Sequence, residues 1–228
     1  LLSALRTAAT VGRSSAVELL LWKLAALGGN VANSAHPLIV AAQNGLLLVV
    51  EMLITAGASL EVSDEQGRTP LWIASCNGHR NVVMTLLRAA PSAKVDATDR
   101  RKLTPLIVAS DGGHLGVVRA LLRAGAAVDA VDQDGEMALH CASASGRLDV
   151  VLELLGAHPP GVNVAGMSGR TPLMAASAGG HLGVVRALLR AGATVDAVDK
   201  VGGTALLFAA ASGRLEAVLE LLGAHPPG

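Results

Sequence analysis

Aromatic residues are almost absent from this chain of 228 residues, because Trp22, Trp72 and Phe208 are the whole set. Hydrophobic residues nevertheless make up 51% of the sequence, so the core must be built from Ala, Leu and Val. Strands favour aromatic and β-branched side chains, whereas closely packed helices accommodate small ones. The composition therefore argues against an all-β fold and favours an all-α one.

An excess of charge of either sign is also missing, since 18 basic and 18 acidic residues cancel. No overall field draws the chain to nucleic acid or to an anionic membrane surface. Charges or glycines interrupt every apolar stretch well short of the roughly 18 residues that a transmembrane helix needs. We therefore expect a soluble chain with no nucleic-acid partner and no membrane insertion.

Cysteine is scarce, and the two present, Cys76 and Cys141, provide no disulfide framework. This fits a reducing compartment, and no signal peptide is visible at the N-terminus. We expect an intracellular, cytoplasmic location. Because Leu1 is not an initiator methionine, we also expect the chain to be part of a longer protein.

The sequence is strongly repetitive. Asp111 to Gly161 and Ala178 to Gly228, offset by 67 residues, differ at only eleven of 51 positions. A finer period is marked by Thr-Pro-Leu or a related triplet, and a period of 20 to 50 residues is typical of solenoids. The triplets begin at residues 3, 36, 69, 104, 137, 171 and 204. This predicts a single array of about seven repeats, at approximately 1–30, 31–63, 64–98, 99–131, 132–165, 166–198 and 199–228.

Each repeat has the pattern of two helices. Thr followed by Pro favours a helix start, because the hydroxyl accepts from a backbone N–H and Pro suits the first helical position. A glycine nine residues after the first triplet residue predicts the end of this helix. A stripe such as Val117, Val118, Leu121 and Leu122 predicts a second helix, followed by an Asp-rich turn such as 132–135. These glycines are at residues 12, 45, 78, 113, 146, 180 and 213.

These features resemble the ankyrin repeat, whose signature is D-x-x-G-x-T-P-L-H-x-A-A-x-x-G-H-x-x-V-V-x-L-L-L-x-x-G-A. Asp64 to Leu87 matches it nearly throughout, and Asp99 to Ala126 matches almost as well. The resemblance covers essentially the whole chain and weakens over residues 1–33. It implies an all-α, ankyrin-type solenoid of stacked helix-turn-helix repeats with protruding turns.

The chain departs from the signature at its histidine. Trp72, Ile107, Met174 and Leu207 replace that residue, and the one repeat that keeps it, at His140, has lost the Thr and Pro. In the family this histidine supports hydrogen bonds within and between repeats. The near absence of the histidine calls those bonds into question.

No residue pattern indicates a catalytic or metal site. His79, His114 and His181 occupy the same place in their repeats, and stacked helices lie about 8–10 Å apart, too far to share a zinc ion. We interpret them as structural. His140 and Cys141 are adjacent, so they point in different directions on a helix and have no third orienting group. We expect no enzyme activity, no metal and no cofactor.

The resemblance implies that a partner docks on the concave side, formed by the turn tips and the exposed positions of the first helices. We expect the strongest contacts at Arg68, Trp72, Arg100 and Arg101, because Trp and Arg dominate binding energies. The alternative is that the tips are ordinary solvated turns and that Trp72 fills the space of the missing histidine. The candidate residues are Glu65, Gln66, Arg68, Trp72, Asn77, Arg100, Arg101, Lys102, Asp111, Gln133, Asp134 and Glu136.

The functional hypothesis is a non-enzymatic protein–protein interaction module. Two alternatives remain: a structural array that acts as a spacer, and the regulatory or targeting portion of a larger enzyme. Arrays usually end in a polar capping repeat, but the last repeat copies the fifth from Leu215 to Gly228 almost unchanged. We therefore expect further repeats to follow and self-association through the apolar C-terminal end.

Overall fold

The computed structural model describes residues 2–11, 13, 15–17, 19–20, 35–89, 95–157 and 161–224, and within these ranges it contains helices and turns but no strand. The helices are α1 (Leu2–Thr10), α3 (Ala35–Gln43), α4 (Leu47–Thr55), α5 (Pro70–Cys76), α6 (Arg80–Ala89), α7 (Pro105–Gly112), α8 (Leu115–Arg123), α9 (Ala138–Ala144), α10 (Leu148–Ala157), α11 (Pro172–Gly179), α12 (Leu182–Arg190), α13 (Ala205–Ala211) and α14 (Leu215–Ala224).

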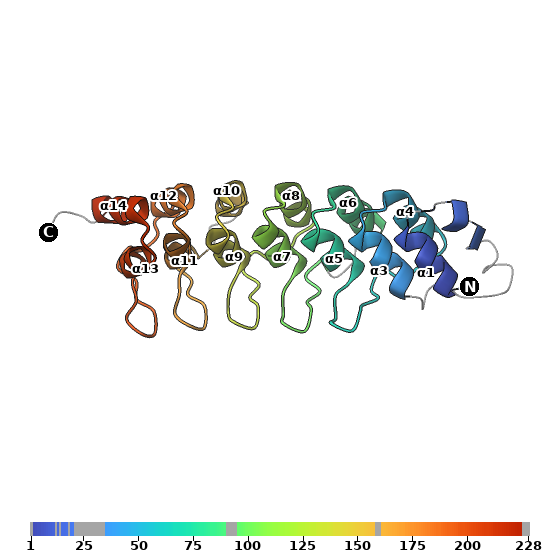
Figure 1. Cartoon of the computed structure of the whole chain (residues 1–228), viewed down its shortest axis with the longest axis horizontal. Helices are drawn as coiled ribbons and strands as arrows, with labels where there is room; N and C mark the ends of the chain where they lie inside the picture. The colour runs from blue at the N-terminus through green and yellow to red at the C-terminus, as the bar shows by residue number, and fades with distance from the viewer. Residues whose placement is uncertain are drawn as a thin grey trace. The chain divides into compact units, whose positions relative to one another are not determined.

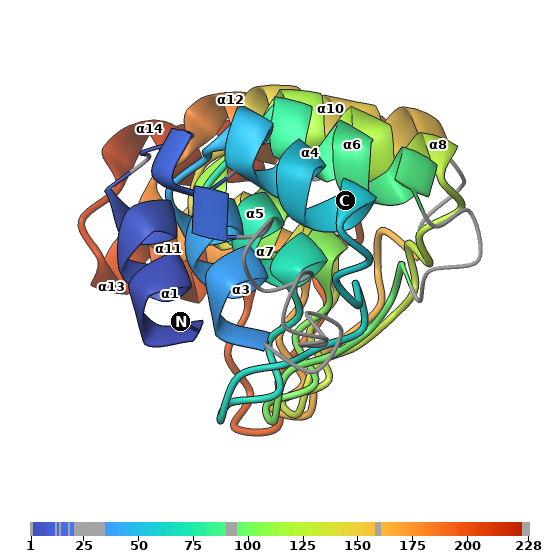
Figure 2. The same ribbon diagram turned by 90° about the vertical axis from the view of Figure 1, so that its right-hand side faces the viewer.

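The chain forms two compact units. The N-terminal unit comprises Leu1–Pro105 and Arg123–Ala126, and the C-terminal unit comprises Leu106–Leu122 and Ala127–Gly228. In the first, α1, α3 and α5 pack in a row, and α3 and α5 lie on α4 and α6 respectively (Figure 1). In the second, α9, α11 and α13 pack in a row beneath α10, α12 and α14. Each unit is thus a stack of helix pairs with long turns below the first helices (Figure 2).

The fold class is therefore the all-α one expected from the sequence. Residues 21–34, which cover the end of the expected first repeat and the start of the second, lie outside the described residues, and the division into seven repeats stays a prediction. Self-association also stays a prediction. The last helix pair, however, leaves Leu207, Leu215, Leu219 and Leu222 between 52% and 68% exposed.

The expected helix starts are present. The hydroxyl of Thr69 accepts a hydrogen bond from the backbone N–H of Trp72 at 3.2 Å, and Pro70 takes the first helical position. Thr171 and Thr204 cap α11 and α13 in the same way. These caps satisfy N–H groups that have no partner inside the helix, which fixes where α5, α11 and α13 begin.

The expected glycines end the first helices in the left-handed conformation, with φ between 66° and 76° at residues 45, 78, 113, 146, 180 and 213. Gly12 lies outside the described residues. A second constraint acts on these positions, because a Cβ on Gly146 would lie 2.5 Å from the ring of His181. A Cβ on Gly113 would similarly lie 2.7 Å from Arg147. The absence of a side chain thus lets the next repeat approach.

The approaching side chains bond the ends of the preceding first helices. Nε2 of His79 lies 2.9 Å from the carbonyl oxygen of Gln43, and Nε2 of His181 lies 2.9 Å from that of Ala144. In other repeats an arginine side chain donates the equivalent bond. Arg147 donates to the carbonyl of Asp111, and Arg214 donates to the carbonyl of Ala178. The structural interpretation of His79 and His181 is therefore confirmed.

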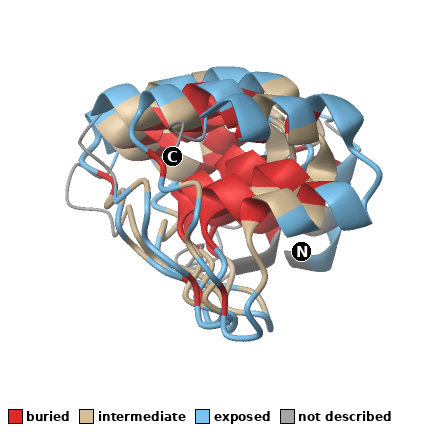
Figure 3. Ribbon diagram, turned by 90° about the vertical axis from the view of Figure 1, so that its left-hand side faces the viewer, coloured by how far each residue is buried: buried red, intermediate tan, exposed pale blue. Residues whose placement is uncertain are grey.

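The core lies between the first and second helices of each pair (Figure 3). In α8 the side chains of Val117, Val118 and Leu121 are at most 1% exposed. Leu122, expected on the same stripe, is only half-buried, because it lies at the edge of that face. Burying such side chains contributes roughly 1.5–3 kcal/mol each, so these stripes hold the two layers together.

Four serine hydroxyls are an exception within this apolar core. Ser75, Ser110, Ser143 and Ser177 share one position in the first helices and are fully buried. Their hydroxyl oxygens have no hydrogen-bond partner. A buried polar group without a partner destabilises the folded state, so alanine should be preferred at this position.

Replacing Ser143 by Ala should raise the free energy of unfolding by about 1 kcal/mol or more, because it removes an unbonded hydroxyl. Urea denaturation measures the change. Ala144→Ser, on the exposed face of the same helix, isolates the difference in helix propensity, about 0.5 kcal/mol. A Ser143→Ala variant that is less stable than the parent protein would show that the hydroxyl contributes a bond.

Candidate functional site

Five turns, here called tips, share one backbone arrangement. They are the third (64–68), fourth (99–103), fifth (132–136), sixth (166–170) and seventh (199–203) tips, numbered by their expected repeats. In each, the first N–H donates to the last carbonyl, and the fourth N–H donates to the first carbonyl. These two bonds close every tip in the same way.

Four of the tips begin with an aspartate, whose side chain accepts hydrogen bonds from backbone N–H groups of its own tip. In the fourth tip, Oδ1 of Asp99 accepts the backbone N–H groups of Arg101 and Leu103, both at 2.9 Å. Asp64, Asp132 and Asp199 bond their own tips in the same pattern. The sixth tip has Gly166 at this position. Such bonds stabilise a turn, because they satisfy N–H groups that have no partner in the backbone of the turn.

Successive tips of one unit are also bonded to each other. In the N-terminal unit the N–H of Arg100 donates to the carbonyl of Gln66 at 2.9 Å. In the C-terminal unit Met167 donates to Asp134 at 2.7 Å, and Lys200 donates to Ser168 at 3.1 Å. The tip backbones are therefore fixed, while their outer side chains are exposed.

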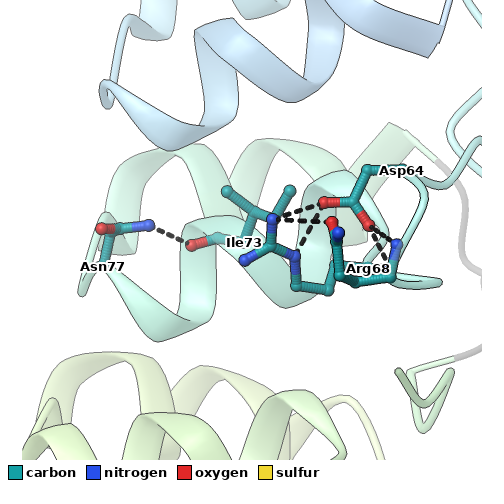
Figure 4. A network of polar contacts seen from close by, with 5 residues as sticks. Asp64, Arg68, Ile73 and Asn77 are labelled. Atoms are coloured by element: carbon teal, nitrogen blue, oxygen red, sulfur yellow. Dashed lines mark hydrogen bonds and ion pairs between the residues drawn. The ribbon is translucent and has the colours of Figure 1, made fainter. Parts of the chain in front are cut away.

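Arg68 is less available to a partner than the sequence suggested. Its guanidinium forms an ion pair with Asp64 at 2.7 Å (Figure 4). It also contacts the side-chain oxygen of Gln66 at 3.3 Å and lies over the Trp72 ring, 5.6 Å from its centroid. Burial raises the pKa of Asp64, but hydrogen bonds from the Arg68 side chain and backbone outweigh it and lower that pKa overall. Glu65 and Gln66 remain exposed on the same tip.

Trp72 is an interior residue, with 7% of its surface exposed. Its indole N–H donates to the carbonyl of Leu103 at 2.8 Å. His140, at the same position two repeats later, has Nε2 at 3.2 Å from the carbonyl of Arg170, while its Nδ1 accepts the N–H of Met137. The substitutions of the signature histidine called the hydrogen bond between repeats into question, and this bond is present at Trp72 and at His140. Trp72 takes over the role of the histidine, as the alternative interpretation held.

Asn77 and Asp111 have structural partners although both are exposed. The side-chain amide of Asn77 donates to the carbonyl of Ile73 at 2.8 Å, one turn earlier in its own helix (Figure 4). A carboxylate oxygen of Asp111 accepts from the hydroxyl of Ser145 at 2.5 Å. Each therefore stabilises a helix end or a contact between repeats.

Arg100, Arg101 and Lys102 form a basic fourth tip. All three are exposed, and none forms an ion pair with the residues that the structure describes. Lys102 has a φ of 60°, in the left-handed region. The corresponding residues of the other tips are Gly67, Gly135, Gly169 and Gly202, whose φ values lie between 72° and 84°. Lysine thus occupies a conformation that favours glycine.

The fifth tip, in the C-terminal unit, is acidic. Gln133 and Asp134 are exposed, and Glu136 is half-buried. Burial raises the pKa of Glu136, and the neighbouring carboxylates of Asp132 and Asp134 raise it further. Negative charge is therefore concentrated on this tip.

The sequence analysis omitted apolar side chains on the last two tips from its candidates. Met167 is 66% exposed and Val201 is 89% exposed. Val198, directly before the seventh tip, is 62% exposed. Their places on the tips were visible in the sequence, because Arg100 and Gln133 occupy the position of Met167, and Arg101 and Asp134 that of Val201.

His140 and Cys141 are not arranged as a base and a nucleophile. Both ring nitrogens of His140 lie against backbone groups, and burial raises the pKa of the Cys141 thiol to about 12. Neither cysteine forms a disulfide. Within the described ranges no group of His, Cys, Asp or Glu side chains could hold a metal ion. No helix there is long and apolar enough to cross a membrane.

A family model described as "Ankyrin repeats (3 copies)" matches residues 5–99, 91–165 and 158–227. The chain belongs to the ankyrin-repeat family. Ankyrin repeats are generally protein–protein interaction modules and are typically not catalytic. A comparison with curated proteins finds no match to this ankyrin-repeat chain.

The contact between Trp72 and Leu103 can be tested by substitution. Trp72→Phe should lower the free energy of unfolding by about 1 kcal/mol, because the Leu103 carbonyl loses the indole donor and keeps only the N–H of Asp99. Trp72→His should be less destabilising despite its smaller and more polar ring, since His140 makes the equivalent bond. Met174→Leu, at the same position in the sixth repeat, provides a control for side-chain size. A phenylalanine variant more stable than the histidine variant would contradict this role.

Proposed function

We propose that this ankyrin-repeat array binds a protein partner through its tips and the adjoining exposed positions of the first helices. The resemblance to ankyrin repeats implies that such contacts lie on the concave side, which supports the proposal. One observation carries the proposal: tips with the same backbone, fixed by hydrogen bonds, present different side chains from one to the next. A surface that is already ordered loses little entropy when it binds.

The chemistry of the tips defines two binding regions. In the N-terminal unit, Glu65, Gln66 and the basic fourth tip supply polar and charged contacts, with Arg68 held in place by Asp64. In the C-terminal unit, the acidic fifth tip is followed by the apolar Met167 and Val201. Arginine is enriched among residues that contribute most to binding, and exposed charges mainly accelerate association.

A structural spacer is the second candidate function, and the internal duplication favours it. The two blocks of 51 residues differ at only eleven positions, and small side chains occupy the exposed first-helix positions Ala144 and Ala211 and the half-buried position Ala178. The same duplication repeats an ion pair, since Arg119 bonds Glu153 and Arg186 bonds Glu220, both at 2.8 Å. A spacer requires this regularity but no exposed basic tip.

Affinity capture with the whole chain, followed by mass spectrometry, identifies the partner. Arg100→Glu combined with Arg101→Glu should then weaken binding by at least about 2 kcal/mol, because the two arginines lie on the proposed surface. Arg80→Glu with Arg88→Glu is a matched control, since it changes the charge equally on exposed positions of α6. Unchanged affinity of a folded Arg100, Arg101 variant would exclude the basic tip from the binding surface. If the chain is only a spacer, no captured partner will bind the Arg100, Arg101 variant and the Arg80, Arg88 variant with different affinities.

A further inference from the structure

The backbone of the fourth tip does not require lysine. The N–H of Lys102 donates to the carbonyl of Asp99 at 3.0 Å, and glycine makes the same bond at the corresponding place in the other four tips. A left-handed φ is unfavourable for a residue with a Cβ and is freely adopted by glycine. Lysine at this position therefore makes the folded chain less stable than glycine would.

No interaction of the side chain offsets this disadvantage within the described residues. Lys102 is exposed, and its ammonium group has neither an ion pair nor a hydrogen bond there. Non-glycine residues in strained backbone conformations concentrate at functional sites, where the surrounding structure holds them in place. The side chain is thus useful for what it presents to a molecule outside the chain, and what it presents is a positive charge.

The other residues of the same tip strengthen that charge. Arg100 and Arg101 add two exposed guanidinium groups on the same tip. Oδ1 of Asp99, the one acidic residue in the tip, already accepts two backbone N–H groups. Asp64, on the adjacent tip, is paired with Arg68. The fourth tip therefore carries three cations on a backbone whose position is fixed.

We propose that the basic fourth tip recognises a segment of the protein partner that is rich in Asp and Glu. This rests on the function proposed above and names the chemistry of the partner. Guanidinium groups bind carboxylates in bidentate geometry, and the fixed backbone holds three cations ready for such contacts. Nucleic acid fits less well, because its binding requires a longer basic track, whereas Glu65 is exposed on the adjacent tip.

Selection from a random peptide library on the whole chain tests this proposal before the partner has been identified. Peptides that bind should be enriched in Asp and Glu, and replacing those residues by Asn and Gln should abolish binding. Arg100→Gln with Arg101→Gln should lower the affinity for a selected acidic peptide at least about tenfold. Lys102→Gly should lower the same affinity about threefold or more without lowering Tm, because glycine occupies this place in the other tips. Lys200→Gln, which removes an exposed cation from the seventh tip, is the matched control and should have little effect.

The outcomes separate this proposal from the general one. Peptides that bind without acidic residues, or whose affinity is unchanged in Lys102→Gly, would overturn the acidic-partner proposal and leave protein binding intact. Failure of the chain to select any peptide would count against both proposals. A single-stranded oligonucleotide that displaces an acidic peptide at equal or lower concentration would assign the tip to nucleic acid and overturn the assignment to a protein segment.

Discussion

A first helix ends on carbonyl groups that its own backbone cannot bond, and for α3, α7, α9 and α11 the next repeat supplies a donor. The guanidinium of Arg147 bonds the carbonyl of Asp111, and the imidazole of His181 bonds that of Ala144. The glycine that ends each helix also leaves room for the donor, since a Cβ on Gly113 would collide with Arg147. Stacking is therefore required by the hydrogen bonds of the backbone as well as by the apolar core.

The tips extend this dependence on the neighbouring repeat to the candidate binding surface. Trp72 and His140 bond the last carbonyl of the next tip, and the N–H of Arg100 bonds the tip before it. The backbone of a tip is thus held by bonds within the tip and by its neighbours, and hardly by its own outer side chains. Those side chains vary from basic to acidic to apolar without changing the tip, which is what a binding surface requires.

Local signals in the sequence predicted the fold well. Thr69 with Pro70 marks a helix start and Gly78 a helix end, because caps depend on residues within a few positions. The role of Trp72 could not be inferred in this way, since its partner, Leu103, is 31 residues away. The strain at Lys102 becomes visible only when its φ is compared with those of the glycines in the other tips. The resemblance to ankyrin repeats implied the candidate surface, but the structure was needed to separate the buried Trp72 from the exposed Arg100.

Amide hydrogen exchange on the unliganded chain tests most directly whether the tips are ordered before any partner binds. The N–H groups of Arg100, Met167 and Lys200, which bond the preceding tips, should exchange at least about 100-fold more slowly than in an unstructured peptide. Such protection at all three would show a surface already in place. Exchange at the unstructured rate would contradict the account, because the tip backbones would then not be fixed by their neighbours.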